Sequence, residues 1–454
     1  MCGVFGVRAP GRDVARLTYF GIYALQHRGQ ESAGIAVSED GRLTAMRDLG
    51  LVPQVFDERS LSGLKGDLAI GHTRYSTTGG NAWANAQPLL HHGRVRTVAL
   101  GHNGNLVNVE ALRELVGKPL ASSSDSEVIA ALIADDERPL EEAVSAVMRE
   151  LEGAATVVGL ADGKLFAFRD SFGFRPLVIG RLGDDPVFAS ETCALDLVGA
   201  TFEREVHPGE LVVADEDGLH SIRGVEAAEH GALCIFEFFY LARPDTRLDG
   251  VEIHGARVRM GEQLAKEAPV DADLVLPIPD SGTPAAIGFA RATGIPFSEG
   301  LIKNRYVGRT FIQPEQGMRE QGIRMKFNPL AEVSGKRLVV VDDSIVRGST
   351  TRQIVQMLFD AGAAEVHVRV SSPPVVSPCY YGIDLASEDE MIAAHSTVEE
   401  VRRAIGATSL AYISLEGLQA ATHRPAKELC RACLTREYPT RVPQDAAKLR
   451  FETV

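Results

Sequence analysis

The sequence lacks the features that would place it in a membrane or on a nucleic acid. It contains no run of about 18 apolar residues, so a membrane-spanning helix is not expected. The formal net charge is −14, which argues against nucleic acid or an anionic membrane as the main partner. The first residues lack a basic segment followed by a long apolar one, so we expect no secretory signal and predict a cytoplasmic location.

Cysteine is also scarce, with six residues in a chain of 454. In a chain without an export signal, so few cysteines indicate a reducing compartment and catalytic or metal-binding roles rather than disulfides. Glycine and proline are at ordinary levels and 45% of the residues are hydrophobic, which is typical of a globular protein with an ample core. The length predicts two large domains or about three smaller ones.

One stretch, RLVVVDDSIVRGSTTR, organises the second half of the chain. The apolar run Leu338–Val341 predicts a buried parallel strand, and two acids, Asp342 and Asp343, follow it directly. A loop of small residues, Ser344–Thr350, then leads into a helix and a second strand, Val366–Val370. The stretch therefore predicts a β–loop–α–β unit whose loop lies at the carboxyl end of a strand, where open α/β sheets bind ligands.

The composition of this loop predicts a phosphate site. Gly348, Ser349 and Thr350 offer backbone N–H groups and hydroxyls at a helix N-terminus. No Gly-Lys-Ser/Thr closes the loop as in a Walker motif, and the spaced glycines of a dinucleotide site are missing. An acid pair alone would fit an ordinary strand–turn–helix, but acids before a phosphate cradle suit a sugar phosphate.

The whole string resembles the phosphoribosyl pyrophosphate (PRPP) motif of the type I phosphoribosyltransferases. The resemblance implies a parallel-sheet domain that binds PRPP and Mg²⁺. It implies that PRPP is bound by Asp342, Asp343, Ser344, Arg347, Gly348, Ser349 and Thr350, and that Mg²⁺ is held by Ser281, Asp342 and Asp343.

Cys2 raises the possibility of an N-terminal nucleophile. A small second residue usually permits removal of Met1, which would leave Cys2 with a thiol and a free α-amine. Such an amine, with a pKa near about 8, can act as the base for its own side chain. The alternative is a buried cysteine that only fills space, and Cys2 on its own favours that alternative.

Several separated motifs favour the nucleophile over the space-filling cysteine at position 2. In order, the chain contains MCGVFG, LQHRGQESAGIAV, GHTRYSTTG, GHNGNLVN and SSSDSEV. Together they resemble the class II glutamine amidotransferase domain, whose fold is a four-layer αββα sandwich of the Ntn-hydrolase type. The resemblance implies that Cys2 is the nucleophile, that Asn103 and Gly104 donate to the oxyanion, and that Arg74, Asp125 and Gly29 bind glutamine.

Turn spacing predicts where the first domain ends. From about Ala143 the chain alternates apolar strands with Asp-Gly turns, which predicts antiparallel hairpins that suit the αββα sandwich. The polar, turn-rich segment Asp215–Gly231 precedes alternating strands and helices. We therefore predict an α+β glutaminase domain over residues 2–230 and an α/β phosphoribosyltransferase domain over residues 231–454, which includes a cysteine-bearing C-terminal segment.

Two further stretches match the transferase. In the first, Thr283 is predicted to cap a helix that Gly294 ends, and the resemblance makes Asp280, Ser281 and Gly282 a pyrophosphate loop. The second, residues 301–328, is basic in an acidic chain. Read alone it would be solvated surface, but the resemblance makes it a flexible loop that closes over PRPP with Lys303 and Arg305.

The remaining cysteines predict a metal site. Cys234, Cys379, Cys430 and Cys433 match the iron–sulfur ligands of one branch of the glutamine PRPP amidotransferases in their local strings. Four thiolates suit a [4Fe–4S] cluster or a structural zinc, and the resemblance favours iron–sulfur. Cys193 has no obvious partner and is interpreted as a core residue.

The fusion of the two halves resembles the glutamine PRPP amidotransferase family as a whole. The resemblance implies conversion of glutamine, PRPP and water into 5-phosphoribosylamine, pyrophosphate and glutamate, with ammonia passed between sites. It also implies a homotetramer and inhibition by purine nucleotides. Two alternatives are a PRPP-sensing regulator and a glutamine amidotransferase that feeds a sugar isomerase or an asparagine ligase; the glutaminase motifs disfavour the first and the PRPP string disfavours the second.

Overall fold

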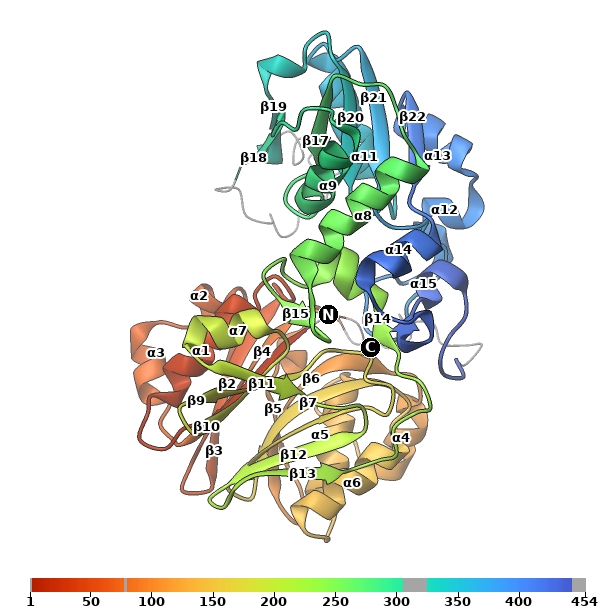
Figure 1. The fold of residues 1–454 in the computed structure, drawn as a ribbon. Helices are drawn as coiled ribbons and strands as arrows, with labels where there is room; N and C mark the ends of the chain where they lie inside the picture. Colours follow the sequence, from red (N-terminus) through yellow and green to blue (C-terminus); the bar gives the residue numbers. More distant parts are fainter. Residues whose placement is uncertain (1, 77–79, 305–324, 443–454) are drawn as a thin grey trace.

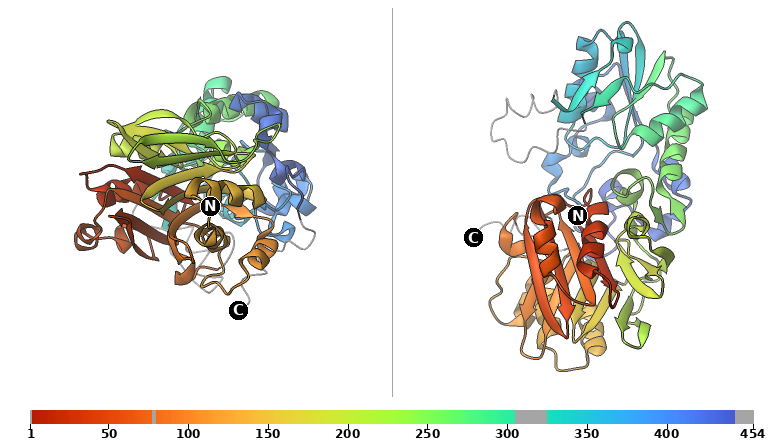
Figure 2. Two further views of the ribbon diagram at one scale, coloured as in Figure 1. Left: turned by 90° about the horizontal axis from the view of Figure 1, so that it is seen from below. Right: turned by 90° about the vertical axis from the view of Figure 1, so that its left-hand side faces the viewer.

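The computed structural model describes residues 2–76, 80–304 and 325–442. The chain forms two bodies joined along one side, with the N-terminal half below and the C-terminal half above in Figure 1. The right-hand view of Figure 2 shows the same division, and helix α8 (Ile253–Glu267) runs from near the contact of the bodies along the C-terminal one. None of the helices in this described part is both long enough and apolar enough to cross a membrane.

The N-terminal half is built on two stacked antiparallel sheets. The seven-stranded sheet has the order β11-β9-β10-β1-β4-β2-β3, with the strands β1 (Gly3–Arg8), β2 (Ser32–Glu39), β3 (Arg42–Leu49), β4 (Leu68–Arg74), β9 (Val178–Leu182), β10 (Asp185–Ala189) and β11 (Thr201–Glu205). The six-stranded sheet has the order β13-β12-β8-β7-β6-β5, with β5 (Leu89–His92), β6 (Thr97–Leu106), β7 (Gly153–Ala161), β8 (Lys164–Arg169), β12 (Glu210–Asp215) and β13 (Gly218–Arg223).

Helices cover the outer face of each sheet. Helices α1 (Val14–Ala24) and α7 (Thr192–Val198) pack on the first sheet, and α5 (Asp125–Asp135) and α6 (Leu140–Glu150) pack on the second. A third apolar cluster fills the space between the sheets, because each strand presents alternate side chains to its two faces. The αββα sandwich predicted from the sequence is therefore confirmed.

The predicted hairpins are present, with two corrections. Strands β7 and β8 pair antiparallel, as do β9 and β10. The expectation of strands from Ala143 onward is wrong, because Ala143 lies in helix α6, whose apolar residues recur at helical spacing. The segment Asp215–Gly231 is not all turn, because it contains the edge strand β13.

The C-terminal half contains a four-stranded parallel sheet of order β17-β20-β21-β22, formed by β17 (Leu274–Pro277), β20 (Arg337–Asp342), β21 (Glu365–Val370) and β22 (Ser409–Tyr412). Apolar clusters lie on both of its faces, as burial of a parallel sheet requires. The covering helices are α8, α9 (Thr283–Thr293), α11 (Ser349–Asp360), α13 (Val398–Ile405) and α14 (Leu415–Thr422).

The predicted β–loop–α–β unit is confirmed as β20, α11 and β21. Helix α11 begins after Gly348, which has a φ of 74°. Only glycine adopts this left-handed conformation without strain, so the turn into the helix depends on it. Helix α9 ends at Gly294 as predicted, but Gly282 rather than Thr283 is its N-cap.

Short elements complete the fold. The helical ones are α2 (Val52–Val55), α3 (Glu58–Gly63), α4 (Val109–Val116), α12 (Ile392–His395), α15 (Ala432–Thr435), the π-helix η2 (Glu237–Leu241) and the 3₁₀ turns η1 (Trp83–Asn85), η3 (Ala331–Val333), η4 (Glu388–Glu390) and η5 (Ala426–Glu428). The short strand pairs are β14 (Leu233–Cys234) with β23 (Leu429–Cys430), β15 (Arg247–Leu248) with β16 (Val251–Glu252), and β18 (Leu301–Lys303) with β19 (Phe327–Pro329).

A carboxyl pair at the contact of the two bodies makes stability depend on pH. Glu205 in β11 accepts a hydrogen bond from the backbone N–H of Asp249, and burial raises the pKa of Glu205 to about 7 against the opposing charge of Arg169. The folded state therefore holds this proton more tightly than the unfolded state. The free energy of unfolding should fall as pH rises from about 4.5 to about 7.

Glu205→Gln should remove this fall, because the amide resembles the protonated acid and carries no charge. We expect equal stability at pH 5 and a gain on the order of 2 kcal/mol over the unchanged protein at pH 8. Denaturant unfolding at the two pH values measures the difference. Glu203→Gln is the control, because Glu203 lies on the same strand but is partly exposed and paired with Arg181. Parallel pH curves for Glu205→Gln and the unchanged protein would contradict the prediction.

Candidate functional site

The predicted nucleophile lies at the start of strand β1. Cys2 is buried, its backbone nitrogen lies 3.2 Å from Asn103 Oδ1, and its Sγ lies 3.6 Å from the carbonyl oxygen of Tyr75. Asn103 comes from β6 of the other sheet, so the stacking of the sheets brings the two residues together. The amide Nδ2 of Asn103 is buried and has no hydrogen-bond partner within the described residues.

An unpaired buried N–H donor is costly unless a ligand completes it. The side chain of Asn103 is fixed by its oxygen on the Cys2 nitrogen, which leaves the N–H₂ group available beside the thiol. Gly104 follows Asn103 in the same strand. This geometry suits a donor for the oxyanion of an acyl intermediate formed on Cys2.

The residues predicted to bind glutamine lie around this centre. Arg74 ends β4 and is 3% exposed, and its guanidinium donates to Ser76 Oγ at 2.9 Å and Gly80 O at 3.3 Å. A Cβ on Gly29 would lie 2.5 Å from the Arg74 backbone nitrogen, so only glycine permits this close approach. The predicted partners of glutamine therefore include a buried cation, whose guanidinium also lies 3.8 Å from Glu31.

Asp125 is the first residue of helix α5, and its Oδ2 accepts from the backbone N–H of Leu106 at 3.1 Å. Burial alone would raise the pKa of Asp125, but the nearby His102 holds it below its ordinary value. Asp125 is therefore a carboxylate and can bind an ammonium group. Sequence reasoning missed His102, although it directly precedes Asn103 in the motif.

The predicted PRPP residues gather at the carboxyl end of β20. Asp343 accepts hydrogen bonds from Ser281 Oγ and, at 2.5 Å, from Ser344 Oγ. Burial raises the pKa values of Asp342 and Asp343, and the charge of Asp343 raises that of Asp342 further. Two buried adjacent carboxyls with a hydroxyl between loops are a hard oxygen donor set of the kind that Mg²⁺ prefers.

The predicted cationic residues are paired within the protein. Lys303 Nζ lies 2.5 Å from Asp280 Oδ2, and Arg347 lies 2.8 Å from Glu390. Both pairs are partly exposed, so exchange for phosphate oxygens costs little. Arg305 and most of the predicted closing loop lie outside the described residues.

The predicted PRPP residues line two different cavities. One of about 610 Å³ is lined by residues of both halves, among them His27, Asp342, Asp343 and the loop from Ser344 to Thr351. Ser281 and Arg347 also line it, whereas Asp280 and Lys303 line a second cavity of about 940 Å³. Cys2 lines neither cavity, so the glutaminase centre and the phosphate loop are distinct sites.

The four predicted metal ligands come from distant parts of the sequence, and two of them lie opposite each other in a short strand pair. Strands β14 and β23 pair in parallel with Cys234 opposite Cys430, and the carbonyl oxygen of Cys433 accepts from Val376 N at 2.9 Å. The Sγ of Cys379 accepts from two backbone N–H groups at 3.4 Å. All four are at most 8% exposed and form no disulfide.

Burial is the main influence on the pKa values of three of these thiols. Burial raises the pKa of Cys234 to about 11, and burial followed by the neighbouring thiols raises those of Cys430 and Cys433. No group of three or more His, Cys, Asp or Glu among the described residues is arranged so that it could hold a metal ion. Cys193, as predicted, is a buried core residue.

Comparison with known proteins decides the family. A glutamine amidotransferase domain model matches residues 72–197, and a phosphoribosyl transferase domain model matches residues 252–372. Amidophosphoribosyltransferase from Mycobacterium tuberculosis (strain H37Rv) is 52% identical, over 98% of this chain and 88% of the relative. The enzyme of that name from Bacillus subtilis is 47% identical, over 98% of this chain and 95% of the relative.

The chain belongs to the amidophosphoribosyltransferase family. A solved structure of glutamine PRPP amidotransferase from Bacillus subtilis, complexed with ADP and GMP, superposes with a TM-score of 0.92 at 46% identity. It covers 98% of both chains. The comparisons thus confirm the family and the fold that we predicted from the sequence of this chain.

Proposed function

We propose that this member of the amidophosphoribosyltransferase family converts glutamine, PRPP and water into 5-phosphoribosylamine, pyrophosphate and glutamate. The reaction is the first step of purine synthesis in this family. The observation that carries the proposal is that one chain contains both sites. The Asn103 amide without a partner among the described residues lies near Cys2 in one half, and the phosphate loop with its two carboxyls lies in the other. An assay of pyrophosphate release from PRPP, with glutamine and then with ammonium as nitrogen donor, tests it.

In the glutaminase half, the Cys2 thiolate attacks the amide carbon of glutamine. The oxyanion that forms is stabilised by the Asn103 amide and the Gly104 N–H, ammonia leaves, and water hydrolyses the thioester to glutamate. Arg74 binds the substrate carboxylate, Asp125 binds its ammonium group and Gly29 lines the pocket. These roles are supported by the burial of Arg74 and by the ionised state of Asp125.

In the transferase half, the loop from Ser344 to Thr350 binds the phosphate of PRPP. Asp342 and Asp343 bind the ribose hydroxyls, and Asp280–Gly282 with Lys303, Arg305 and Arg347 bind the pyrophosphate. Ser281, Asp342 and Asp343 would hold Mg²⁺, which would supply charge neutralisation for the leaving group. Ammonia attacks ribose C1 as pyrophosphate leaves.

The four cysteines fit an iron–sulfur cluster by their chemistry. Cys234, Cys379, Cys430 and Cys433 are buried thiols that form no disulfide. Burial raises the pKa values of Cys234, Cys430 and Cys433, and a bound metal would favour the thiolate form. They would hold a [4Fe–4S] cluster, which would supply a covalent link between β14 and the C-terminal segment. Zinc is the alternative occupant of four cysteines.

Four broader features belong to the proposal. The Bacillus subtilis structure contains ADP and GMP, which supports inhibition of this enzyme by purine nucleotides. A homotetramer, a cytoplasmic location and a boundary between the two domains near residue 230 complete the proposal.

Asn103→Ala tests the oxyanion role. The variant should lose glutamine-dependent activity by about 100- to 1000-fold, as loss of one oxyanion donor does in other acyl transfers. The ammonia-dependent rate should not change. Asn105→Ala is the control, because Asn105 lies on the same strand and its amide donates to Tyr380 O rather than toward Cys2. A loss of glutaminase activity for Asn105→Ala as large as that for Asn103→Ala would contradict a specific role.

A further inference from the structure

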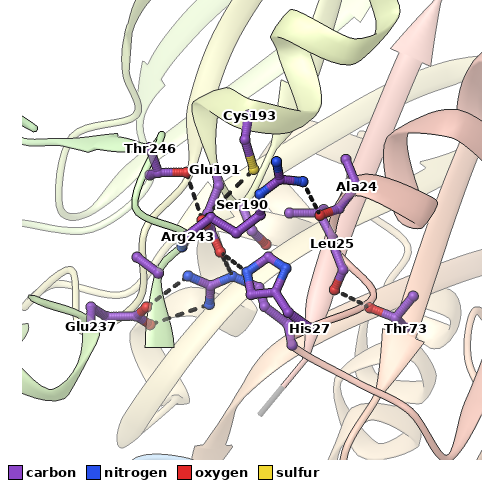
Figure 3. Close-up of polar contacts among 12 residues, drawn as sticks. Ala24, Leu25, His27, Thr73, Ser190, Glu191, Cys193, Glu237, Arg243 and Thr246 are labelled. Atoms are coloured by element: carbon purple, nitrogen blue, oxygen red, sulfur yellow. Dashed lines mark hydrogen bonds and ion pairs between the residues drawn. The ribbon is translucent and has the colours of Figure 1, made fainter. Parts of the chain in front are cut away.

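A buried set of alternating charges joins the two halves (Figure 3). Its residues have no role in the reaction proposed above. Glu191 accepts hydrogen bonds from Arg28 Nε, from Thr246 Oγ1 at 2.6 Å and from the backbone N–H of Arg243 at 2.9 Å. On its other side Arg28 donates to Glu237 at 2.7 and 3.2 Å. The side chains of Arg28, Glu191 and Glu237 have no exposed surface.

His27 is partly exposed, unlike Arg28, Glu191 and Glu237. Its Nε2 lies 2.6 Å from Glu191 Oε1, and its side chain is 27% exposed. Burial alone would raise the pKa of Glu191, but Arg28 and then His27 hold it well below its ordinary value. Glu191 is therefore a carboxylate and accepts the Nε2–H of the ring, which makes Nδ1 the proton-accepting nitrogen of neutral His27.

His27 belongs to the glutaminase half but lines the cavity of the transferase half. The cavity of about 610 Å³ has His27 and Arg28 on one wall and Asp342, Asp343 and the phosphate loop on the others. Since the two carboxyls lie where the ribose of PRPP is proposed to bind, His27 lies in the same enclosure as the sugar. Ammonia that leaves the glutaminase half must end in this enclosure.

The chemistry in this cavity requires a proton acceptor. When ammonia attacks ribose C1, the C–N bond forms, the C–O bond to pyrophosphate breaks, and the nitrogen carries a positive charge until it loses one proton. We propose that His27, oriented by Glu191, accepts this proton at Nδ1. The inference rests on the proposed function, and it leaves the product as the neutral amine and His27 as an imidazolium paired with Glu191.

A purely structural role explains His27 less well. Glu191 already has four other donors, in Arg28, Thr246, Arg243 and Cys193, so it does not need His27 to satisfy its oxygens. Groups of both signs of charge surround the ring. Glu191 and Arg28 lie behind it, and the ionisable residues of the cavity are Tyr75, Tyr240, Asp342, Asp343, Arg347, Asp384 and Glu390.

The test is His27→Gln in the full-length holoenzyme. Glutamine can keep a donor toward Glu191 but cannot accept a proton. With PRPP present, release of glutamate from glutamine should stay within about 2-fold, while release of pyrophosphate should fall about 100-fold with either nitrogen donor, as loss of a general base predicts. The acid side of the pH profile for the ammonium reaction, expressed per neutral ammonia, should flatten.

The control is His220→Gln, because His220 also pairs through Nε2 with a carboxylate, Asp215, at 3.0 Å, but lies on β13 outside the cavity. Equal losses of glutamate and pyrophosphate release, or an unchanged pyrophosphate rate and pH profile, would overturn the inference. His27→Asn is measured in the same way if His27→Gln does not fold. If the unchanged protein released no pyrophosphate from either donor, the proposed function itself would fail.

Discussion

Cys2→Ala should abolish synthesis of phosphoribosylamine from glutamine and leave synthesis from ammonia intact. Without the thiol there is no acyl intermediate, so the glutamine-dependent rate should fall by about 10⁴-fold or more. The ammonia-dependent rate should persist because Cys2 does not line the cavity that contains Asp342 and Asp343. Parallel assays of pyrophosphate release with glutamine and with ammonium measure both rates on one preparation.

The control is Cys193→Ala, which removes another buried thiol from the same half. Burial, followed by the charge of Glu191, raises the pKa of Cys193 to about 12, so this thiol stays protonated and is a poor nucleophile. The variant should keep both activities. If Cys2→Ala lost the two activities equally while still folding and binding PRPP, the assignment of Cys2 to the glutaminase alone would be wrong.

Protein purified without oxygen should be brown and contain about four irons per chain, as a cubane with four cysteine ligands requires. Replacing Cys234, Cys379, Cys430 or Cys433 by Ser should remove the iron and lower the yield and the thermal unfolding midpoint together. Both half-reactions should decline in proportion to folded protein, because these thiols lie outside both proposed active centres. Iron analysis, visible absorbance and thermal unfolding measure the outcome.

The matched control is Cys193→Ser, a buried cysteine that belongs to the core and not to this group. Its iron content should equal that of the unchanged protein. Zinc at one equivalent with no iron would keep the four-cysteine site and exclude the cluster. Normal yield, stability and metal content after loss of one of the four would remove that residue from the site.

Local patterns in the sequence predict much of the phosphate site. Strand β20, its two acids and helix α11 follow one another directly in the chain. The apolar run, the small-residue loop and the helical spacing therefore each predict one element of the unit. The N-cap of α9 is Gly282 and not the predicted Thr283, because both residue types are common at helix starts and the local sequence does not separate them.

The network around Glu191 could not be predicted from the sequence. Arg28, Glu191 and Glu237 lie far apart in the chain, and an isolated charged residue is most often at the surface. Their burial depends on the meeting of the two bodies, which no local pattern records. His27 stands in a recognised motif, but only its distance to Glu191 and its place on the cavity wall distinguish it from its neighbours.

The pairing of β14 with β23 has a consequence for the order in which the protein matures in the cell. Cys234 leaves the ribosome long before Cys430, and its strand has no partner until the end of the chain has been synthesised. The glutaminase half has been synthesised by then, and domains generally fold as units in order of synthesis. Insertion of a cluster that needs Cys430 and Cys433 would therefore have to wait until almost the whole chain has been synthesised.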